Sequence, residues 1–174
     1  MPRRRVAGKI FIVFILRLIA VVCLDIGCAK PITYKTDIVS ETLEIKLPSR
    51  IESVEEAAAV AVEFAQKRGL GDEFIYALDL ALRESVANAI KHGNKFDEAK
   101  DVEVKLEDGT ESFNVTVRDF GTGFLIDDIP DPTNPENLLK NNGRGILFMN
   151  SFMDDIEWSN SPDGGLIVKM SKRK

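Results

Sequence analysis

The chain has 174 residues, of which 44% are hydrophobic and 29% are charged, and this composition excludes a disordered tail, a collagen-like fibre and a polytopic membrane protein. Residues 1–30 hold six Lys or Arg and one Asp and so carry +5, and because the formal net charge is -5, residues 31–174 carry -10. An acidic domain is a poor candidate for binding nucleic acid directly, because affinity for phosphate backbones comes mainly from Lys and Arg.

Residues 1–30 combine a basic start with an apolar run over 10–26, which is typical of a signal peptide or membrane anchor. Arg17 interrupts that run and would cost about 2.5–3.5 kcal/mol at the centre of a membrane helix. A lipid attached to Cys28 is a second interpretation, and a third is that translation begins further along the chain. We expect a leader over 1–30 and a folded domain over 31–174, which is cytoplasmic or, with a real leader, anchored to the inner membrane through 10–26.

The first part of this domain predicts a strand followed by a helix. Thr42–Leu47 alternates apolar and polar residues as a half-buried strand does, and Pro48 ends the alternation. Ser53 followed by Glu56 predicts a capping box at the start of a helix that runs to Gly69.

The next part predicts a longer helix and a hairpin. Apolar residues recur at helical spacing over 72–92, and Gly93 is the expected stop. Asp101–Glu107 and Ser112–Asp119 alternate as two paired strands, with the turn Asp108-Gly109 between them.

The last part begins with a long loop over 125–142, which contains three prolines and four asparagines. A third helix is expected over Gly145–Met153, with Phe148 packed in the core. Ile156–Ser159 and Leu166–Met170 then predict two further strands.

The order of these elements is strand, two helices, two strands, helix and two strands. Hairpins grouped with helices are typical of a two-layer sandwich. We therefore expect an α/β (α+β) fold, with a mixed, mostly antiparallel sheet covered by helices on one face.

Three short segments stand out chemically, and the first is on the second helix. Glu84, Asn88 and His92 are four residues apart, so they lie along one side of that helix. Glu84 and Asn88 are either part of a solvated face or oxygen ligands for a hard cation such as Mg2+, which also binds substrate phosphates. His92, next to Gly93, is expected to interact with the helix C-terminus rather than to act as a base.

The second segment, Asp119-Phe120-Gly121-Thr122-Gly123, follows a predicted strand. Glycines there allow the backbone to approach a ligand closely, and Asp119 could accept a hydrogen bond from an exocyclic amine such as that of adenine. The alternative is an ordinary tight turn.

The third segment, Gly143-Arg144-Gly145-Ile146, opens a predicted helix. Unpaired amides at a helix N-terminus bind phosphate, and Arg144 could add a charge-assisted contact. The alternative is a glycine-rich helix entry with a solvated arginine.

Taken together and in this order, the segments resemble the three ATP-binding boxes of the GHKL superfamily: Glu84-x-x-x-Asn88-Ala89-x-x-His92-Gly93, Asp119-x-Gly121-x-Gly123 and Gly143-Arg144-Gly145-Ile146. Within that superfamily the chain resembles the bacterial anti-sigma factor serine/threonine-protein kinases over residues 41–172. The resemblance implies a Bergerat-type ATP-binding fold, with ATP between the helices and the sheet under a lid formed by 125–142.

The resemblance also implies a role for each matched residue. Glu84 would be the general base that deprotonates a substrate serine, Asn88 would hold Mg2+ between the phosphates, and Asp119 would bind the adenine amino group. Gly121 and Gly123 would lie near the base and ribose, and Gly143, Arg144, Gly145 and Ile146 would surround the phosphates. Many family members have a Gly-Thr near the last strand whose hydroxyl helps to bind adenine, whereas this chain reads Gly164-Gly165-Leu166.

The partners implied by the resemblance are a sigma factor and an anti-anti-sigma antagonist of the STAS type, which the kinase would phosphorylate to prevent it from displacing the sigma factor. Relatives tend to dimerise, so a homodimer is a further expectation. Two alternatives stay open. One is an ATP-binding switch without catalysis, and the other is the catalytic module of a histidine kinase.

Overall fold

The computed structural model describes residues 33–36, 42–123 and 144–174, and the account below is confined to them. All described residues belong to one compact unit, Thr33–Lys174. Its elements, in chain order, are β1 (Thr33–Thr36), β2 (Thr42–Pro48), α2 (Glu52–Lys67), α3 (Asp72–Asn88), the π-helical turn η1 (Ala89–Gly93), β3 (Asp101–Asp108), β4 (Ser112–Arg118), α5 (Arg144–Phe152), β5 (Asp155–Asn160) and β6 (Leu166–Arg173).

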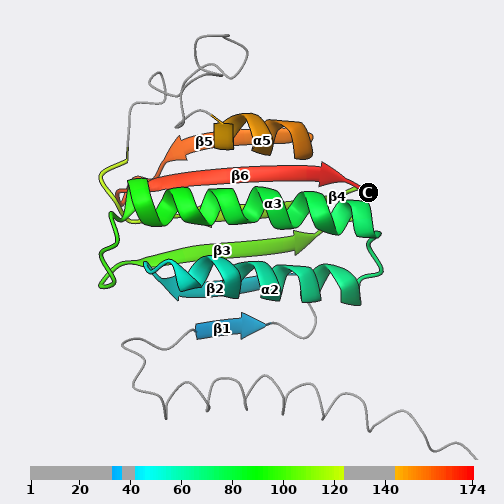
Figure 1. Cartoon of the computed structure of the whole chain (residues 1–174), viewed down its shortest axis with the longest axis horizontal. Helices are drawn as coiled ribbons and strands as arrows, with labels where there is room; N and C mark the ends of the chain where they lie inside the picture. The colour runs from blue at the N-terminus through cyan, green and yellow to red at the C-terminus, as the bar shows by residue number, and fades with distance from the viewer. Residues whose placement is uncertain (1–32, 37–41, 124–143) are drawn as a thin grey trace, which may run out of the picture. The chain divides into compact units, whose positions relative to one another are not determined.

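The described strands form one six-stranded sheet in the order β1-β2-β3-β4-β6-β5. Every neighbouring pair is antiparallel, so the mixed sheet allowed by the sequence is, in this part of the chain, antiparallel throughout. The three α-helices α2, α3 and α5 cover one face of the sheet (Figure 1). The predicted two-layer α/β sandwich is therefore confirmed, with β1 as a strand that the sequence did not predict.

The alternation of side chains explains which face of the sheet the helices cover. Residues at every second position of β2, β3 and β4 are almost fully buried: Leu43, Ile45, Leu47, Val102, Val104, Leu106, Phe113, Val115 and Val117. The Phe113 ring lies edge-on to the rings of Phe64 on α2 and Phe74 on α3, with centroids 5.8 and 5.9 Å apart. Burial of these apolar side chains holds the helices against the sheet.

The capping box predicted at Ser53 is wrong. Helix α2 begins at Glu52, and Ser53 is fully buried, with its hydroxyl donating a hydrogen bond to the carbonyl of Pro48 at 2.6 Å. Glu56 accepts a hydrogen bond from Arg50 at 3.0 Å instead of reaching back to a cap. The reason is the very short connection after β2, which brings the strand end close enough to take the serine hydroxyl.

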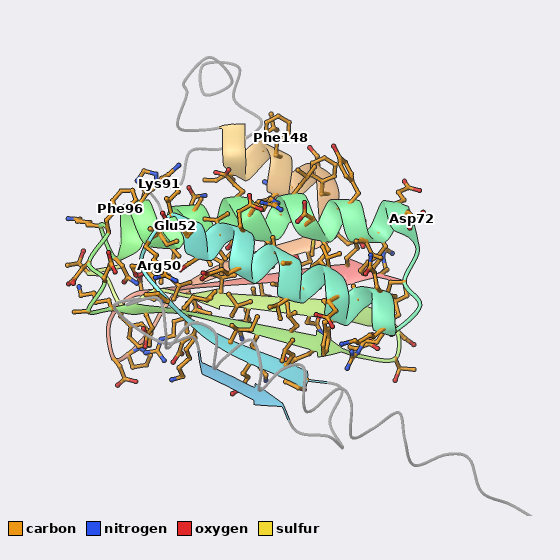
Figure 2. The ribbon with its side chains drawn as sticks, turned by 60° about the horizontal axis from the view of Figure 1, so that its bottom comes forward. Arg50, Glu52, Asp72, Lys91, Phe96 and Phe148 are labelled. Atoms are coloured by element: carbon orange, nitrogen blue, oxygen red, sulfur yellow. The ribbon has the colours of Figure 1, made fainter. Side chains whose placement is uncertain are left out.

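The helix boundaries otherwise agree with the periodicity of the sequence. The pattern over 72–92 corresponds to α3 together with η1, and it ends at Gly93 as expected. Helix α5 begins one residue earlier than predicted, at Arg144. Phe148, expected in the core, is 56% exposed and points away from the sheet (Figure 2), whereas its neighbour Met149 is buried.

Two segments discussed above lie outside the described residues, namely the leader over 1–30 and the whole of the predicted lid over 125–142. Within the described residues, no helix has the length and apolar character needed to cross a membrane.

Candidate functional site

Asp119 lies just beyond the end of β4 and is a buried acid, only 3% exposed. Its Oδ1 accepts hydrogen bonds from the backbone amides of Gly121 at 2.9 Å and Leu166 at 3.2 Å. Burial raises the pKa of this carboxyl above its ordinary value of 3.8, although the two amide hydrogen bonds and the charges of Lys100 and Arg118 oppose the shift. Asp119 is therefore a fixed, desolvated hydrogen-bonding group.

The last strand begins next to this acid, where the sequence reads Gly164-Gly165-Leu166. The backbone amide of Leu166 contacts the Asp119 carboxyl directly. The amide of Asp119 also donates to the carbonyl of Leu166 at 3.0 Å, so the two residues are linked by one backbone bond and by one bond from the Leu166 amide to the Asp119 side chain. This link extends the pairing of β4 with β6 by one residue.

Three glycines enclose Asp119 so tightly that none has room for a side chain. A Cβ on Gly93 would lie 2.2 Å from Cγ of Asp119, and one on Gly165 would lie 2.0 Å from its carbonyl oxygen. A Cβ on Gly121 would lie 2.1 Å from the carbonyl oxygen of Gly93. Three segments that are far apart in the sequence therefore meet at this acid, and their close approach requires glycine.

Gly123 has a different role from Gly121. Its φ of +69° lies in the left-handed region, and a Cβ there would meet Oδ1 of Asn160 at 2.6 Å. The predicted Asp-x-Gly-x-Gly segment is thus a turn in which both positions require glycine, because a side chain at either one would overlap with other atoms of the same chain.

Asn94 is a residue that the sequence analysis missed. It directly follows η1, is only 2% exposed, and its Oδ1 accepts a hydrogen bond from the backbone amide of Phe120 at 2.7 Å. An asparagine after a helix-ending glycine is ordinary in a sequence, and nothing local indicates that this one is buried. Only the assembled structure identifies it.

Glu84 and Asn88 lie side by side on α3, as their spacing predicts. Nδ2 of Asn88 donates a hydrogen bond to Oε1 of Glu84 at 3.1 Å, and both side chains are half-buried. His92 is exposed and lies on η1, beyond the end of the α-helix. The structure therefore brings together the acid and the amide of the first segment and leaves the histidine apart.

The third segment contributes to the same place. Gly145 in the first turn of α5 packs so closely against Glu84 that a Cβ there would lie 1.8 Å from Oε1. The N-terminus of α5, where backbone amides lack helical partners, is thus next to the Glu84 carboxylate. Ile146 is half-buried in the same turn, whereas Gly143 and the side chain of Arg144 lie outside what the structure describes.

One helix joins the two halves of the site. Glu84 on α3 contacts α5, and Gly93 at the end of η1 contacts Asp119. The arrangement offers a buried acid on one side and a carboxylate, an amide and a helix N-terminus on the other. These groups suit a ligand that has a hydrogen-bond donor at one end and anionic groups at the other.

The residues present also fit a magnesium ion that is held partly by its ligand. The described residues contain no group of three or more His, Cys, Asp or Glu that could hold a metal by themselves. Asn88 directs its nitrogen at Glu84, so the other side of its amide is an oxygen, the ligand type that Mg2+ takes. Mg2+ usually has one or two protein ligands, with phosphate and water supplying the rest.

Comparison with known proteins gives consistent matches. Residues 47–172 match the model of a family described as histidine kinase-like ATPase domain. The chain is 25% identical to the serine-protein kinase RsbW of Oceanobacillus iheyensis over 136 residues, covering 75% of this chain and 85% of the relative. It is 33% identical to the anti-sigma F factor of Clostridium perfringens over 97 residues, covering 53% of this chain and 68% of the relative.

Solved structures show the same fold. A crystal structure of RsbU and RsbW domains from Mycobacterium tuberculosis superposes with a TM-score of 0.57 at 19% identity, covering 76% of this chain and 32% of that one. The catalytic domain of the histidine kinase ThkA superposes with a TM-score of 0.50 at 15% identity, covering 71% of this chain and 90% of that one.

Proposed function

The chain belongs to the family of histidine kinase-like ATPase domains, and we propose that it is an ATP-dependent protein serine kinase that also acts as an anti-sigma factor. Relatives that bear the names serine-protein kinase and anti-sigma factor support this proposal. The observation that carries it is the position of Glu84, which lies between Asn88 and the N-terminus of α5. A base at that point is next to the place where phosphate groups would bind.

The proposed nucleotide lies along α3 and η1. Asp119 accepts a hydrogen bond from the adenine amino group, with Gly121 and Gly123 beside the base and ribose. The phosphates bind at the N-terminus of α5, where Gly143, Arg144, Gly145 and Ile146 surround them. Asn88 ligates Mg2+ through its amide oxygen.

The proposed reaction transfers the γ-phosphoryl group to a serine of a protein substrate. As the serine oxygen forms its bond to phosphorus, Glu84 takes the hydroxyl proton, and the bond from the γ-phosphorus to the β–γ bridging oxygen breaks to leave ADP. A magnesium ion supplies charge neutralisation on the phosphates when it is bound. Asn88 orients the Glu84 carboxylate through the hydrogen bond at 3.1 Å.

The proposed partners are a sigma factor and an anti-anti-sigma protein of the STAS type, and the proposed location is the cytoplasm. The second partner is the substrate. Phosphorylation adds about -1.5 to -2 charge at neutral pH, enough to disrupt a packed interface by repulsion and desolvation. The phosphorylated antagonist then no longer displaces the sigma factor. A homodimer remains part of the proposal.

The test uses the purified chain, Mg2+, ATP labelled on its γ-phosphate and STAS-type proteins from the same genome. Glu84→Gln keeps the shape of the side chain and removes the base. Glu73→Gln, an exposed glutamate in the first turn of α3, is the matched control. We expect label on an antagonist serine with the wild type and Glu73→Gln, and at least a hundredfold slower labelling with Glu84→Gln at similar ATP affinity, since general bases contribute about 10²–10⁴-fold.

Two outcomes would contradict the proposal. Wild-type labelling by Glu84→Gln would refute the role of Glu84 as the base. Absence of ATP binding by the wild type would refute the nucleotide site itself.

A further inference from the structure

Asn94 joins four segments of the chain through one buried side chain. Its Nδ2 donates to Oγ of Ser49 at 2.8 Å and to the carbonyl of Asp101 at 2.9 Å, and its Oδ1 accepts from the amide of Phe120 at 2.7 Å. These partners follow β2, begin β3 and follow β4, respectively. Both amide hydrogens and the amide oxygen are therefore used.

The contact with Phe120 acts directly on Asp119. The backbone amide of Asp119 is held by Leu166 at 3.0 Å, and the next amide along the chain, that of Phe120, is held by Asn94 at 2.7 Å. The chain is thereby fixed on both sides of the Asp119 α-carbon. These two anchors fix the backbone from which the Asp119 carboxyl extends, and the amides of Gly121 and Leu166 then hold its Oδ1.

Asn94 is also linked to Asp119 through the preceding residue in the chain. Its immediate neighbour, Gly93, approaches the Asp119 side chain so closely that a Cβ on it would lie 2.2 Å from Cγ. Asn94 therefore positions both the strand end that bears Asp119 and the helix end that packs against it.

The backbone around Asn94 departs from ordinary helix to make this possible. The Asn94 amide donates to the carbonyl of Ala89 at 2.8 Å, five residues back, which is the π-helical spacing. Lys95 and Phe96 then have φ of +54° and +60°, a conformation that non-glycine residues rarely adopt. Unfavourable backbone of this kind persists only where its surroundings fix it. Here the amide of Phe96 donates to the carbonyl of Ile90 at 2.9 Å, and the amide of Asp97 donates to the carbonyl of Asn94 at 3.0 Å.

From this geometry we propose that Asn94 is a positioning residue for recognition of the nucleotide base, acting through the Phe120 amide on the direction of the Asp119 carboxyl. The inference rests on the proposed function, in which Asp119 accepts a hydrogen bond from the exocyclic amine of adenine. Removing the Asn94 oxygen frees the Phe120 amide. Asp119 then discriminates less well between bases with and without that amine.

The experiment compares the affinities for ATP and for inosine triphosphate, which has an oxygen in place of the adenine amine. Asn94→Ala removes all three hydrogen bonds. Asn94→Ser is a milder change, whose hydroxyl oxygen is one bond too short to reach the Phe120 amide. Ser49→Ala is the matched control. It removes the bond from Asn94 and the bond from the Ser49 hydroxyl to the carbonyl of Lys100, and it leaves the Asn94–Phe120 bond in place.

We expect both Asn94 variants to lose about tenfold in preference for ATP over inosine triphosphate, the factor that one hydrogen bond to an ionised group supplies. Ser49→Ala is expected to lose stability in urea while keeping the wild-type preference. If Asn94→Ala fails to fold, Asn94→Ser provides the comparison. A purely structural role would lower stability in all three variants without changing the ratio of the two affinities.

The outcomes separate this inference from the proposed function. A wild type that prefers ATP, with the same preference in the folded Asn94 variants, would refute the role of Asn94 alone. A wild type that binds both nucleotides equally would refute the proposed role of Asp119 and this inference with it.

Discussion

Gly165→Ala tests whether the crowding around Asp119 limits stability. Gly165 has φ of +87°, and a Cβ there would lie 2.0 Å from the carbonyl oxygen and 2.7 Å from the carbonyl carbon of Asp119. The left-handed backbone costs a non-glycine residue about 1–2 kcal/mol. Overlap with atoms that cannot move adds about 1–3 kcal/mol. The free energy of unfolding should therefore fall by about 2–5 kcal/mol.

The overlap is expected to be costly because it falls on backbone. Asp119 and the following residue are held by hydrogen bonds to Leu166 and Asn94, so the strand end cannot shift without breaking them. Relief would have to come from the turn between β5 and β6, where Gly165 accepts a hydrogen bond from Ser161 at 2.9 Å.

Gly69→Ala is the matched control for this prediction. Gly69 also has a positive φ, +73°, but a Cβ on it would meet no atom within 4 Å. It should cost only the backbone term of about 1–2 kcal/mol. Urea unfolding of the full chain, followed by circular dichroism, measures both variants against the wild type. Equal losses of stability in the two variants would refute the argument that close packing at Asp119 matters.

Two further predictions concern the site itself. Gly145→Ala should displace the Glu84 carboxylate, because a Cβ would lie 1.8 Å from its Oε1, and phosphoryl transfer should slow about a hundredfold. The free energy of unfolding in urea should change little, because the gain in helix propensity of about 1 kcal/mol from alanine offsets the loss of the Asn88–Glu84 hydrogen bond. Wild-type transfer rates in the labelling assay would contradict it. Burial raises the pKa of Asp119 above 3.8, so the folded state favours the protonated acid. Protonation of Asp119 therefore stabilises the folded state below pH 3.8, and this stabilisation is lost as the pH rises through the raised pKa. The unfolding free energy of Asp119→Asn relative to the wild type should therefore increase over that interval in urea titrations, and a constant or decreasing difference would count against the shift.

The sequence by itself determined most of the local structure. Alternation over 42–47 and 101–119 indicated strands and also the face that is buried, because a strand places successive side chains on opposite faces. Helical spacing over 72–92 located α3, and the four-residue spacing of Glu84 and Asn88 predicted their contact, now seen as a hydrogen bond. Such patterns are readable because they depend only on backbone periodicity. Where a nearby strand end competed for the Ser53 hydroxyl, the local capping rule failed.

The tertiary structure alone decided which distant residues meet. Asp119 binds the amide of Leu166, 47 positions away, because β4 pairs with β6 rather than with β5. Glu84 contacts Gly145 because α3 and α5 pack on the same face of the sheet. Asn94 is buried because four segments close around it. Local sequence patterns do not predict such contacts, because these contacts arise from the order of the strands and the packing of the helices.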